Sequence, residues 1–540
     1  MLQKCICLLL FSFLSIILSA QSSGRLYNPA IDILHYEFKL HLTDESDTLQ
    51  GDATIRLRVK EKSSIIFLDL AGKKANGKGM LVSKVMENKE PVDFQQQNDI
   101  LNITLKTPAN PGEIRSFEIL YSGIPEDGLI ISKNKYGHRT FFGDNWPNRA
   151  HFWLPCKDHL SDKASVDFIV TAPDHYQVIS NGIKTEETEL NNHFRLTHWK
   201  ETTDLPTKVM VIGLADFAVN YPGEANGITL SSWVYPEEKD KGFYDYALAA
   251  EILTYYNNKI GPFAYKKLAN VQSKTIFGGM ENASAIFYDE NTITGTRSNE
   301  SLLAHEIAHQ WFGDAATESD WQHLWLSEGF ATEMTHLYLE HKYGRDTLVY
   351  GLKTDRKAVL AFTKRSQKPV VDTTESKHLM ALLNTNSYQK GGWVLQMLRE
   401  ELGDTLFWKS IRLYYQKFNG KNAATTDLQQ IFETVSGKNL EQFFKQWLYT
   451  SENPSLQINW QYLAESGKLL ITIHQLNETL FQFPLELNIV NSDGIKSLQR
   501  INISQKTTHY TFPIKHKPLL IEADPDCRLL FEGSVKESAE

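Results

Sequence analysis

The sequence predicts a multidomain α+β protein. Its 540 residues are too many for a single hydrophobic core, so we expect several domains. Strand-like alternation fills the first part of the chain, helix-period patterns dominate the middle, and short strands separated by turns return near the end. We therefore predict a mostly antiparallel N-terminal β domain over residues 21–221, a mainly helical domain over 222–452 and a small C-terminal β-sandwich over 453–540.

The first twenty residues have the composition of an export signal. A single charge at Lys4 precedes an apolar run from Cys5 to Leu18, and the small residues Ser19 and Ala20 follow it. This pattern predicts a signal peptide over residues 1–20 and an exported protein, periplasmic or extracellular. An uncleaved membrane anchor is the alternative, although the run is short for a bilayer span. No later segment is apolar enough to span a membrane.

The N-terminal domain is predicted from alternating or short apolar runs with turn residues between them. The candidate strands cover residues 33–42, 53–59, 64–68, 166–170, 176–179 and 208–212. The net charge of −9, with no basic block, gives a nucleic-acid partner no electrostatic support.

The middle and the end of the chain differ in their periodicity. A helix is predicted over 243–258 and stopped by Gly261 and Pro262, a strand follows over 268–276, and further helices are expected over 391–402, 406–418 and 426–435. After Pro454, strand candidates recur over 455–462, 469–474, 480–490, 497–503 and 509–512, which is the pattern of a sandwich.

The strongest chemical signal is the pair His305 and His309 with Glu306 between them. On an α-helix this spacing puts the two imidazoles roughly 40° apart and one turn from each other, so both can reach one metal ion. Zinc prefers nitrogen ligands and usually takes a third protein ligand in a catalytic site. Glu306 suits a general base that accepts a proton from a metal-bound water. Glu328, expected to begin a second helix, is the candidate third ligand.

Two further motifs accompany these residues, namely Gly278-Gly279-Met280-Glu281-Asn282 and Tyr388-Gln389-Lys390-Gly391-Gly392. With them, the chain resembles the M1 family of zinc aminopeptidases, the gluzincins. The motifs occur in the family's order, and the resemblance extends over essentially the whole mature chain. It implies a saddle-like N-terminal domain and a thermolysin-like catalytic domain. Aminopeptidase N and its close relatives carry a long helical domain after the region that corresponds to the β-sandwich. This chain therefore resembles a short form of the family without the helical C-terminal domain.

The resemblance also implies roles for individual residues. His305, His309 and Glu328 would hold one zinc ion per chain, Glu306 would act as the general base, and the Tyr388 hydroxyl would stabilise the oxyanion. The segment Gly278, Gly279, Met280, Glu281 and Asn282 would bind substrate. A buried Glu281 carboxylate would pair with the cationic α-amino group of a peptide, so the expected substrates are peptides with a free N-terminus.

The preferred hypothesis is therefore a zinc-dependent aminopeptidase. One alternative is an epoxide hydrolase-like activity, as in the bifunctional leukotriene branch of the family; another is a catalytically inactive peptide-binding protein on the same scaffold. Many relatives bind the substrate amine with a second residue upstream of the Pro155-Cys156 segment. Asp144 and Asn145 are the nearby candidates here, and the sequence leaves that assignment open, together with the oligomeric state.

Overall fold

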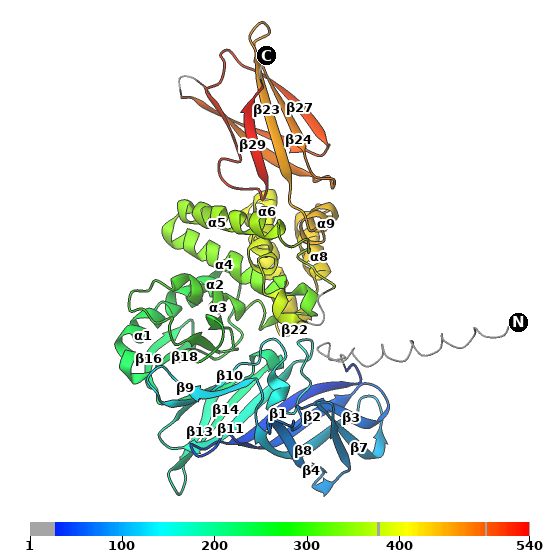
Figure 1. Cartoon of the computed structure of the whole chain (residues 1–540), viewed down its shortest axis with the longest axis vertical. Helices are drawn as coiled ribbons and strands as arrows, with labels where there is room; N and C mark the ends of the chain where they lie inside the picture. Colours follow the sequence, from blue (N-terminus) through cyan, green and yellow to red (C-terminus); the bar gives the residue numbers. More distant parts are fainter. Residues whose placement is uncertain (1–27, 375–377, 492–493, 539–540) are drawn as a thin grey trace, which may run out of the picture.

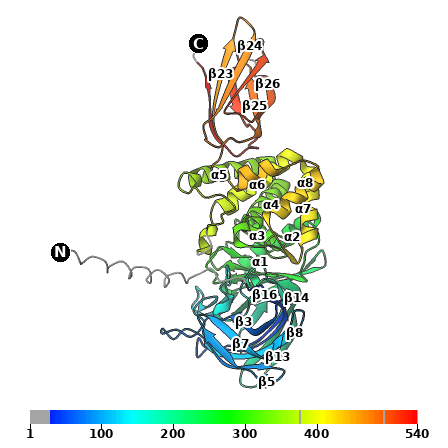
Figure 2. The same cartoon turned by 90° about the vertical axis from the view of Figure 1, so that its right-hand side faces the viewer.

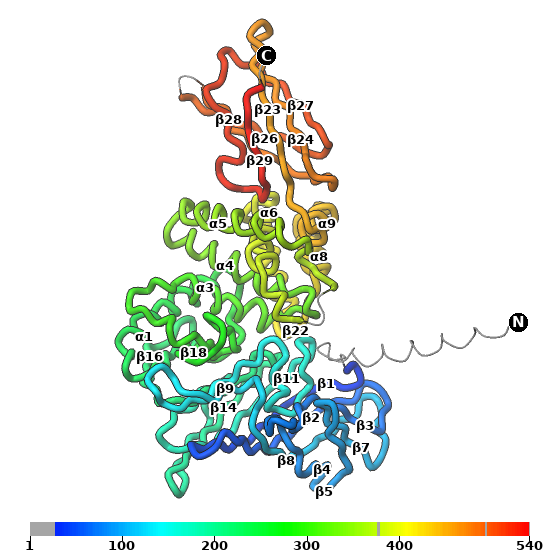
Figure 3. The backbone as a smooth tube through the Cα atoms, in the orientation of Figure 1, coloured from blue at the N-terminus to red at the C-terminus, as the bar shows by residue number. Residues whose placement is uncertain are grey.

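The structure, a computed structural model, describes residues 28–374, 378–491 and 494–538, so the predicted signal peptide lies outside the described residues. Three bodies follow one another along the longest axis (Figure 1): a β domain, a helical domain and a β-sandwich. The view turned by 90° shows the same order (Figure 2), and the backbone tube runs through it from blue to red (Figure 3). The predicted multidomain α+β architecture is confirmed. Among the described residues, no helix has the length and apolar character needed to cross a bilayer.

The N-terminal domain is built on an eight-stranded sheet. Its pairing is antiparallel except between β1 and β11, which run parallel. Buried residues alternate with more exposed ones along β2, because successive side chains of a strand point to opposite faces. The strands are, in sheet order, β13 (Ile183–Glu189), β14 (Phe194–Leu205), β11 (Ala164–Pro173), β1 (Ile31–His41), β2 (Leu49–Val59), β8 (Ile114–Ile124), β4 (Gly79–Glu87) and β5 (Glu90–Pro91).

Two smaller sheets complete this domain. They consist of β12 (Gln177–Ser180), β15 (Ile212–Ala215), β10 (Arg139–Gly143) and β9 (Leu129–Lys133), and of β3 (Ser63–Asp69), β7 (Ile100–Ala109) and β6 (Phe94–Gln97). The predicted strand over 208–212 is wrong, because residues Thr207–Val209 form a 3₁₀ turn before β15. The Asn145 amide donates hydrogen bonds to the carbonyls of Thr207 and Met210, which holds the backbone in this turn.

The helical domain begins with a five-stranded sheet of β16 (Ala218–Ala225), β17 (Ile228–Val234), β18 (Lys267–Ser273), β20 (Ala285–Asp289) and β19 (Gly279–Met280). The predicted change of domain at residues 221 and 222 falls inside β16. Because β16 pairs antiparallel with β17, the whole strand belongs to the sheet of the helical domain. Phe142 of β10 packs edge-on against Phe287 of β20, with ring centroids 5.5 Å apart, and so joins the two domains.

Helices make up the rest of this domain. The helix predicted over 243–258 is divided by a turn at Ala247 and Leu248, whereas the three later predicted helices are confirmed. The helices are α1 (Lys239–Tyr246), α2 (Ala249–Lys259), α3 (Glu300–His309), α4 (Trp325–Tyr343), α5 (Arg345–Thr363), α6 (Gly391–Leu402), α7 (Asp404–Phe418), α8 (Thr425–Ser436) and α9 (Glu441–Leu448). A two-stranded sheet of β21 (Ala316–Glu318) and β22 (Lys421–Ala423) lies beside them.

The C-terminal domain is the predicted sandwich. One sheet contains β27 (Thr507–Pro513), β24 (Lys468–Gln475), β23 (Ser455–Leu463) and β29 (Glu532–Glu537), and the other contains β26 (Lys496–Ile503), β25 (Phe483–Val490) and β28 (Leu520–Ala523). All five predicted strands are present, and β28 and β29 are additional. The predicted boundary at residues 452 and 453 lies in the link between α9 and β23.

Candidate metal centre and active site

Three side chains from two helices converge within the helical domain. His305 and His309 lie one turn apart on α3, with their Nε2 atoms 3.1 Å from each other. Glu328, in the first turn of α4, places Oε2 3.4 Å from His305 Nε2 and 3.2 Å from His309 Nε2. Among the described residues this is the one group of three or more His, Cys, Asp and Glu side chains whose ligand atoms could hold a metal ion.

The electrostatics of this group favour a cation. Burial opposes ionisation of Glu328, but the two histidines outweigh it and lower the pKa of its carboxyl. Burial likewise opposes protonation of His309, and the Glu328 carboxylate outweighs it and raises the pKa of the imidazole. Two imidazole nitrogens and one carboxylate form a donor set typical of catalytic zinc sites. The three residues therefore fit a zinc ion.

The second ring nitrogen of His309 is also held in place. His309 Nδ1 lies 3.1 Å from the Phe312 carbonyl oxygen and 3.0 Å from Ser327 Oγ. An Nδ1–H that donates to the carbonyl leaves the Nε2 lone pair directed at the candidate metal position. Gly313 has φ +117°, and a Cβ there would collide with Ser327 Oγ. The sequence did not predict a role for Ser327, whose only signal was its place next to Glu328.

Glu306 is buried on α3 and faces the short strand β19. A Cβ at Gly279 would collide with the Glu306 carboxylate, so the glycine permits the close approach of strand and helix. Burial raises the pKa of Glu306 to about 8. A cation bound at the neighbouring ligands would lower that pKa and favour the ionised, proton-accepting form.

Tyr388 lies in a π-helical turn, Asn386–Lys390, that leads directly into α6. Its ring stacks on His305 at a centroid distance of 5.9 Å and an interplanar angle of 14°. Gly391 and Gly329 let α6 approach α4 closely, since a Cβ at Gly329 would lie 2.8 Å from the Gly391 carbonyl carbon. Burial raises the pKa of Tyr388 well above its usual value, so the hydroxyl stays protonated and can donate a hydrogen bond.

The Gly278–Asn282 segment is brought to the same site, except for its last residue. Glu281 is buried, and its Oε1 has no hydrogen-bond partner among the described residues. Burial raises the pKa of the Glu281 carboxyl, while the nearby cationic forms of His309 and Lys208 lower it. Asn282 is fully buried and does not line the cavity, so the structure does not bring it to the predicted substrate site.

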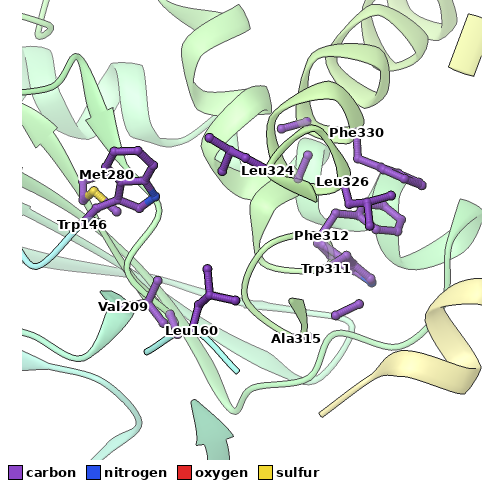
Figure 4. Packing of buried hydrophobic residues seen from close by; sticks show 14 of the residues in the cluster. Trp146, Leu160, Val209, Met280, Trp311, Phe312, Ala315, Leu324, Leu326 and Phe330 are labelled. Atoms are coloured by element: carbon purple, nitrogen blue, oxygen red, sulfur yellow. The ribbon is translucent and has the colours of Figure 1, made fainter. Parts of the chain in front are cut away.

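These side chains surround a cavity of about 250 Å³. Glu281, Glu306, Tyr388 and the three candidate ligands form its polar part, and its apolar wall consists of Trp146, Phe277, Met280, Leu302 and Leu383. Trp146 comes from the N-terminal domain and lies beside Met280 (Figure 4). Edge-on contacts with Phe277 and Trp321, at centroid distances of 6.0 and 5.8 Å, hold the indole in this wall.

The two candidates for a second amine-binding residue are engaged elsewhere. The Asp144 carboxylate accepts hydrogen bonds from Arg149, from the Thr275 hydroxyl and from the Ile276 N–H. The Asn145 side chain bonds the backbone of the 3₁₀ turn and accepts a bond from the Trp153 indole N–H. Neither residue lines the cavity. Their hydrogen bonds instead hold the loop that carries Trp146.

Comparison with known proteins agrees with this geometry. The model of the peptidase M1 N-terminal domain matches residues 33–209, and the model of the peptidase family M1 domain matches residues 244–447. Together the two matches span more than half of the chain and contain all the predicted site residues. The chain belongs to peptidase family M1.

The relatives of this M1 peptidase include named aminopeptidases. "Probable aminopeptidase 2" of Sulfurisphaera tokodaii is 27% identical over 402 residues, which cover 69% of this chain and 50% of that protein. "Puromycin-sensitive aminopeptidase" of Caenorhabditis elegans is 23% identical and matches 82% of this chain and 49% of that protein. The M1 chain thus spans about half the length of these curated relatives.

A solved M1 structure matches this chain over a larger share of its own length than the two aminopeptidases do. The M1 zinc metallopeptidase from Deinococcus radiodurans has a TM-score of 0.65 and 25% identity, with coverage of 77% of this chain and 93% of that one. A mutant of that enzyme with a bound Tyr-Ser-Ala substrate has the same TM-score and covers 79% of this M1 chain.

Proposed function

We propose that this M1 peptidase is a zinc-dependent aminopeptidase that removes the N-terminal residue from peptides, with one zinc ion per chain. His305, His309 and Glu328 hold the zinc. The observation that carries the proposal is the buried Glu281 carboxylate, which has an unpartnered oxygen and lines the same cavity as the three ligands. A buried carboxylate without a partner is costly unless a cation pairs with it, and a peptide's α-ammonium supplies that cation.

The residues around the cavity divide the chemistry between them. When bound, zinc acts as a Lewis acid that polarises the scissile carbonyl and acidifies a water molecule. The Glu306 carboxylate accepts the proton of the attacking water and passes it to the leaving amine nitrogen. The Tyr388 hydroxyl donates a hydrogen bond to the developing oxyanion. β19 is the edge strand of its sheet, so its backbone can pair with an extended substrate.

The apolar wall of Trp146, Phe277, Met280, Leu302 and Leu383 suits an aromatic N-terminal side chain. The Tyr-Ser-Ala substrate bound to the Deinococcus relative supports this choice. Export is proposed from the composition of residues 1–20. Sequencing the N-terminus of the mature protein checks the export proposal, because a start at Met1 contradicts cleavage.

The test of the proposed activity compares two fluorogenic peptides that begin with tyrosine, one with a free and one with an acetylated N-terminus. We expect cleavage of the free peptide alone, and loss of that cleavage after treatment with a chelator, with recovery on addition of zinc. Equal cleavage of both peptides would show endopeptidase character and remove Glu281 from amine recognition. A zinc-loaded protein that cleaves neither peptide would support the inactive peptide-binding alternative.

Removing the amine anchor should abolish this discrimination. Glu281→Ala is expected to lower kcat/KM for the free peptide by about 30- to 150-fold, because a charge-assisted hydrogen bond in a buried site contributes roughly 2–3 kcal/mol. Hydrolysis of the acetylated peptide should not decrease. The measurement is kcat/KM for both peptides, and a retained preference for the free N-terminus would point to another anchor.

A further inference from the structure

Gln310 makes three hydrogen bonds directly beside the candidate metal site. It follows His309 at the end of α3, and its side chain is fully buried. Its Nε2 donates to the Glu281 carbonyl at 2.7 Å and to Asp314 Oδ2 at 2.9 Å, and its Oε1 accepts the Ser284 N–H at 2.8 Å. The Glu281 carbonyl only accepts and the Ser284 N–H only donates, so these two partners determine the orientation of the amide.

These bonds connect the amine anchor to the metal helix. Gln310 holds the backbone of Glu281 and of Ser284, the two ends of the short loop 281–284 that follows β19. Other hydrogen bonds attach this loop to the N-terminal domain, for example from the Asn181 amide to the Ala283 carbonyl. Among the described residues, Gln310 supplies both of the hydrogen bonds that join the loop to the end of α3.

The spacing between anchor and metal determines where a peptide is cut. One residue of extended chain spans roughly 3.3–3.6 Å, so a shift of this size in the loop moves the next peptide bond to the metal. No hydrogen bond from Glu281 Oε1 to the described residues opposes such a shift. The two hydrogen bonds between Gln310 and the backbone of Glu281 and Ser284, the Gln310 clamp, do oppose it.

We propose that Gln310 is a positioning residue that fixes the one-residue spacing between the Glu281 amine anchor and the metal site. The inference rests on the proposed aminopeptidase function. Without the clamp, Glu281 can bind the α-ammonium in more than one position relative to the metal. The enzyme then releases dipeptides as well as single residues and discriminates less against acetylated N-termini.

The test uses Gln310→Met, which keeps an unbranched side chain of similar length but removes all three hydrogen bonds. Gln272→Met is the matched control. Gln272 is also fully buried, donates to Glu238 Oε2 at 2.7 Å and to the Glu290 carbonyl at 3.0 Å, and accepts the Tyr235 N–H at 2.8 Å, away from the cavity. Zinc content, the first product released from a tyrosine-initiated peptide, and kcat/KM for the free and acetylated peptides are measured on both variants.

We expect Gln310→Met to retain zinc and to release dipeptide besides tyrosine. Its preference for the free over the acetylated peptide should fall at least about tenfold, because one buried hydrogen bond contributes roughly that factor. Gln272→Met should release tyrosine alone with the wild-type preference. An equal fall in both rates with tyrosine as the only product would overturn the inference. Absence of any preference in the wild type would overturn the proposed function and this inference with it. If Gln310→Met does not fold, the same measurements are made on Gln310→Asn and judged by the same outcomes. Asparagine is one methylene shorter, so its amide lies farther from the three partners.

Discussion

Glu306→Gln is expected to lower kcat by about 10²- to 10⁴-fold while the protein keeps its zinc. The amide has the shape of the carboxylate but cannot accept the proton of the attacking water. Glu306 is buried between α3 and β19, where a Cβ at Gly279 would already collide with it, so the structure leaves little space for a substitute base. Steady-state kinetics with the free peptide and metal analysis of the same preparation measure the two effects.

Glu333→Gln is the matched control for this variant. Glu333 is a fully buried glutamate of α4, both of its carboxylate oxygens are without a hydrogen-bond partner among the described residues, and burial raises its pKa well above the usual value. A neutral carboxyl is replaced there by a neutral amide, so kcat should stay near the wild-type value. Loss of zinc in Glu306→Gln would identify Glu306 as a ligand and contradict its role as base.

Tyr388→Phe is expected to lower kcat by about 10²- to 10³-fold with little change in KM. The hydroxyl donates to an oxygen that becomes negative only as the reaction proceeds, so its removal affects the transition state more than the bound substrate. The ring remains, and its stacking on His305 at 5.9 Å should preserve the metal site. Kinetics over a range of substrate concentrations separate kcat from KM.

The control for the lost hydroxyl is Tyr414→Phe. Tyr414 is fully buried on α7, and its hydroxyl has no hydrogen-bond partner among the described residues, so its removal should leave both constants unchanged. An unchanged kcat in Tyr388→Phe would remove Tyr388 from the mechanism. An increase in KM alone would assign it to substrate binding instead.

Local periodicity allowed the sequence to predict a large part of this protein. The four-residue spacing of His305 and His309 determines their common helix face, because backbone hydrogen bonds within α3 set 3.6 residues per turn whatever surrounds the helix. Strand alternation predicted the sandwich for the same reason, since successive side chains of a strand always point to opposite faces. The residue types of the motifs then indicated which chemistry to expect.

Only the tertiary structure decided which distant segments meet. Glu328 reaches within 3.2 Å of His309 because α4 packs against α3, and the Gly329–Gly391 contact of α4 and α6 brings Tyr388 to the same cavity. The Gln310 clamp likewise depends on where the loop 281–284 lies against α3. Such contacts join residues far apart in the chain, so their geometry is determined by the packing of complete elements and leaves no period in the sequence. The sequence by itself therefore determined the helix face and the types of chemical group, whereas packing decided their convergence and the spacing between anchor and metal.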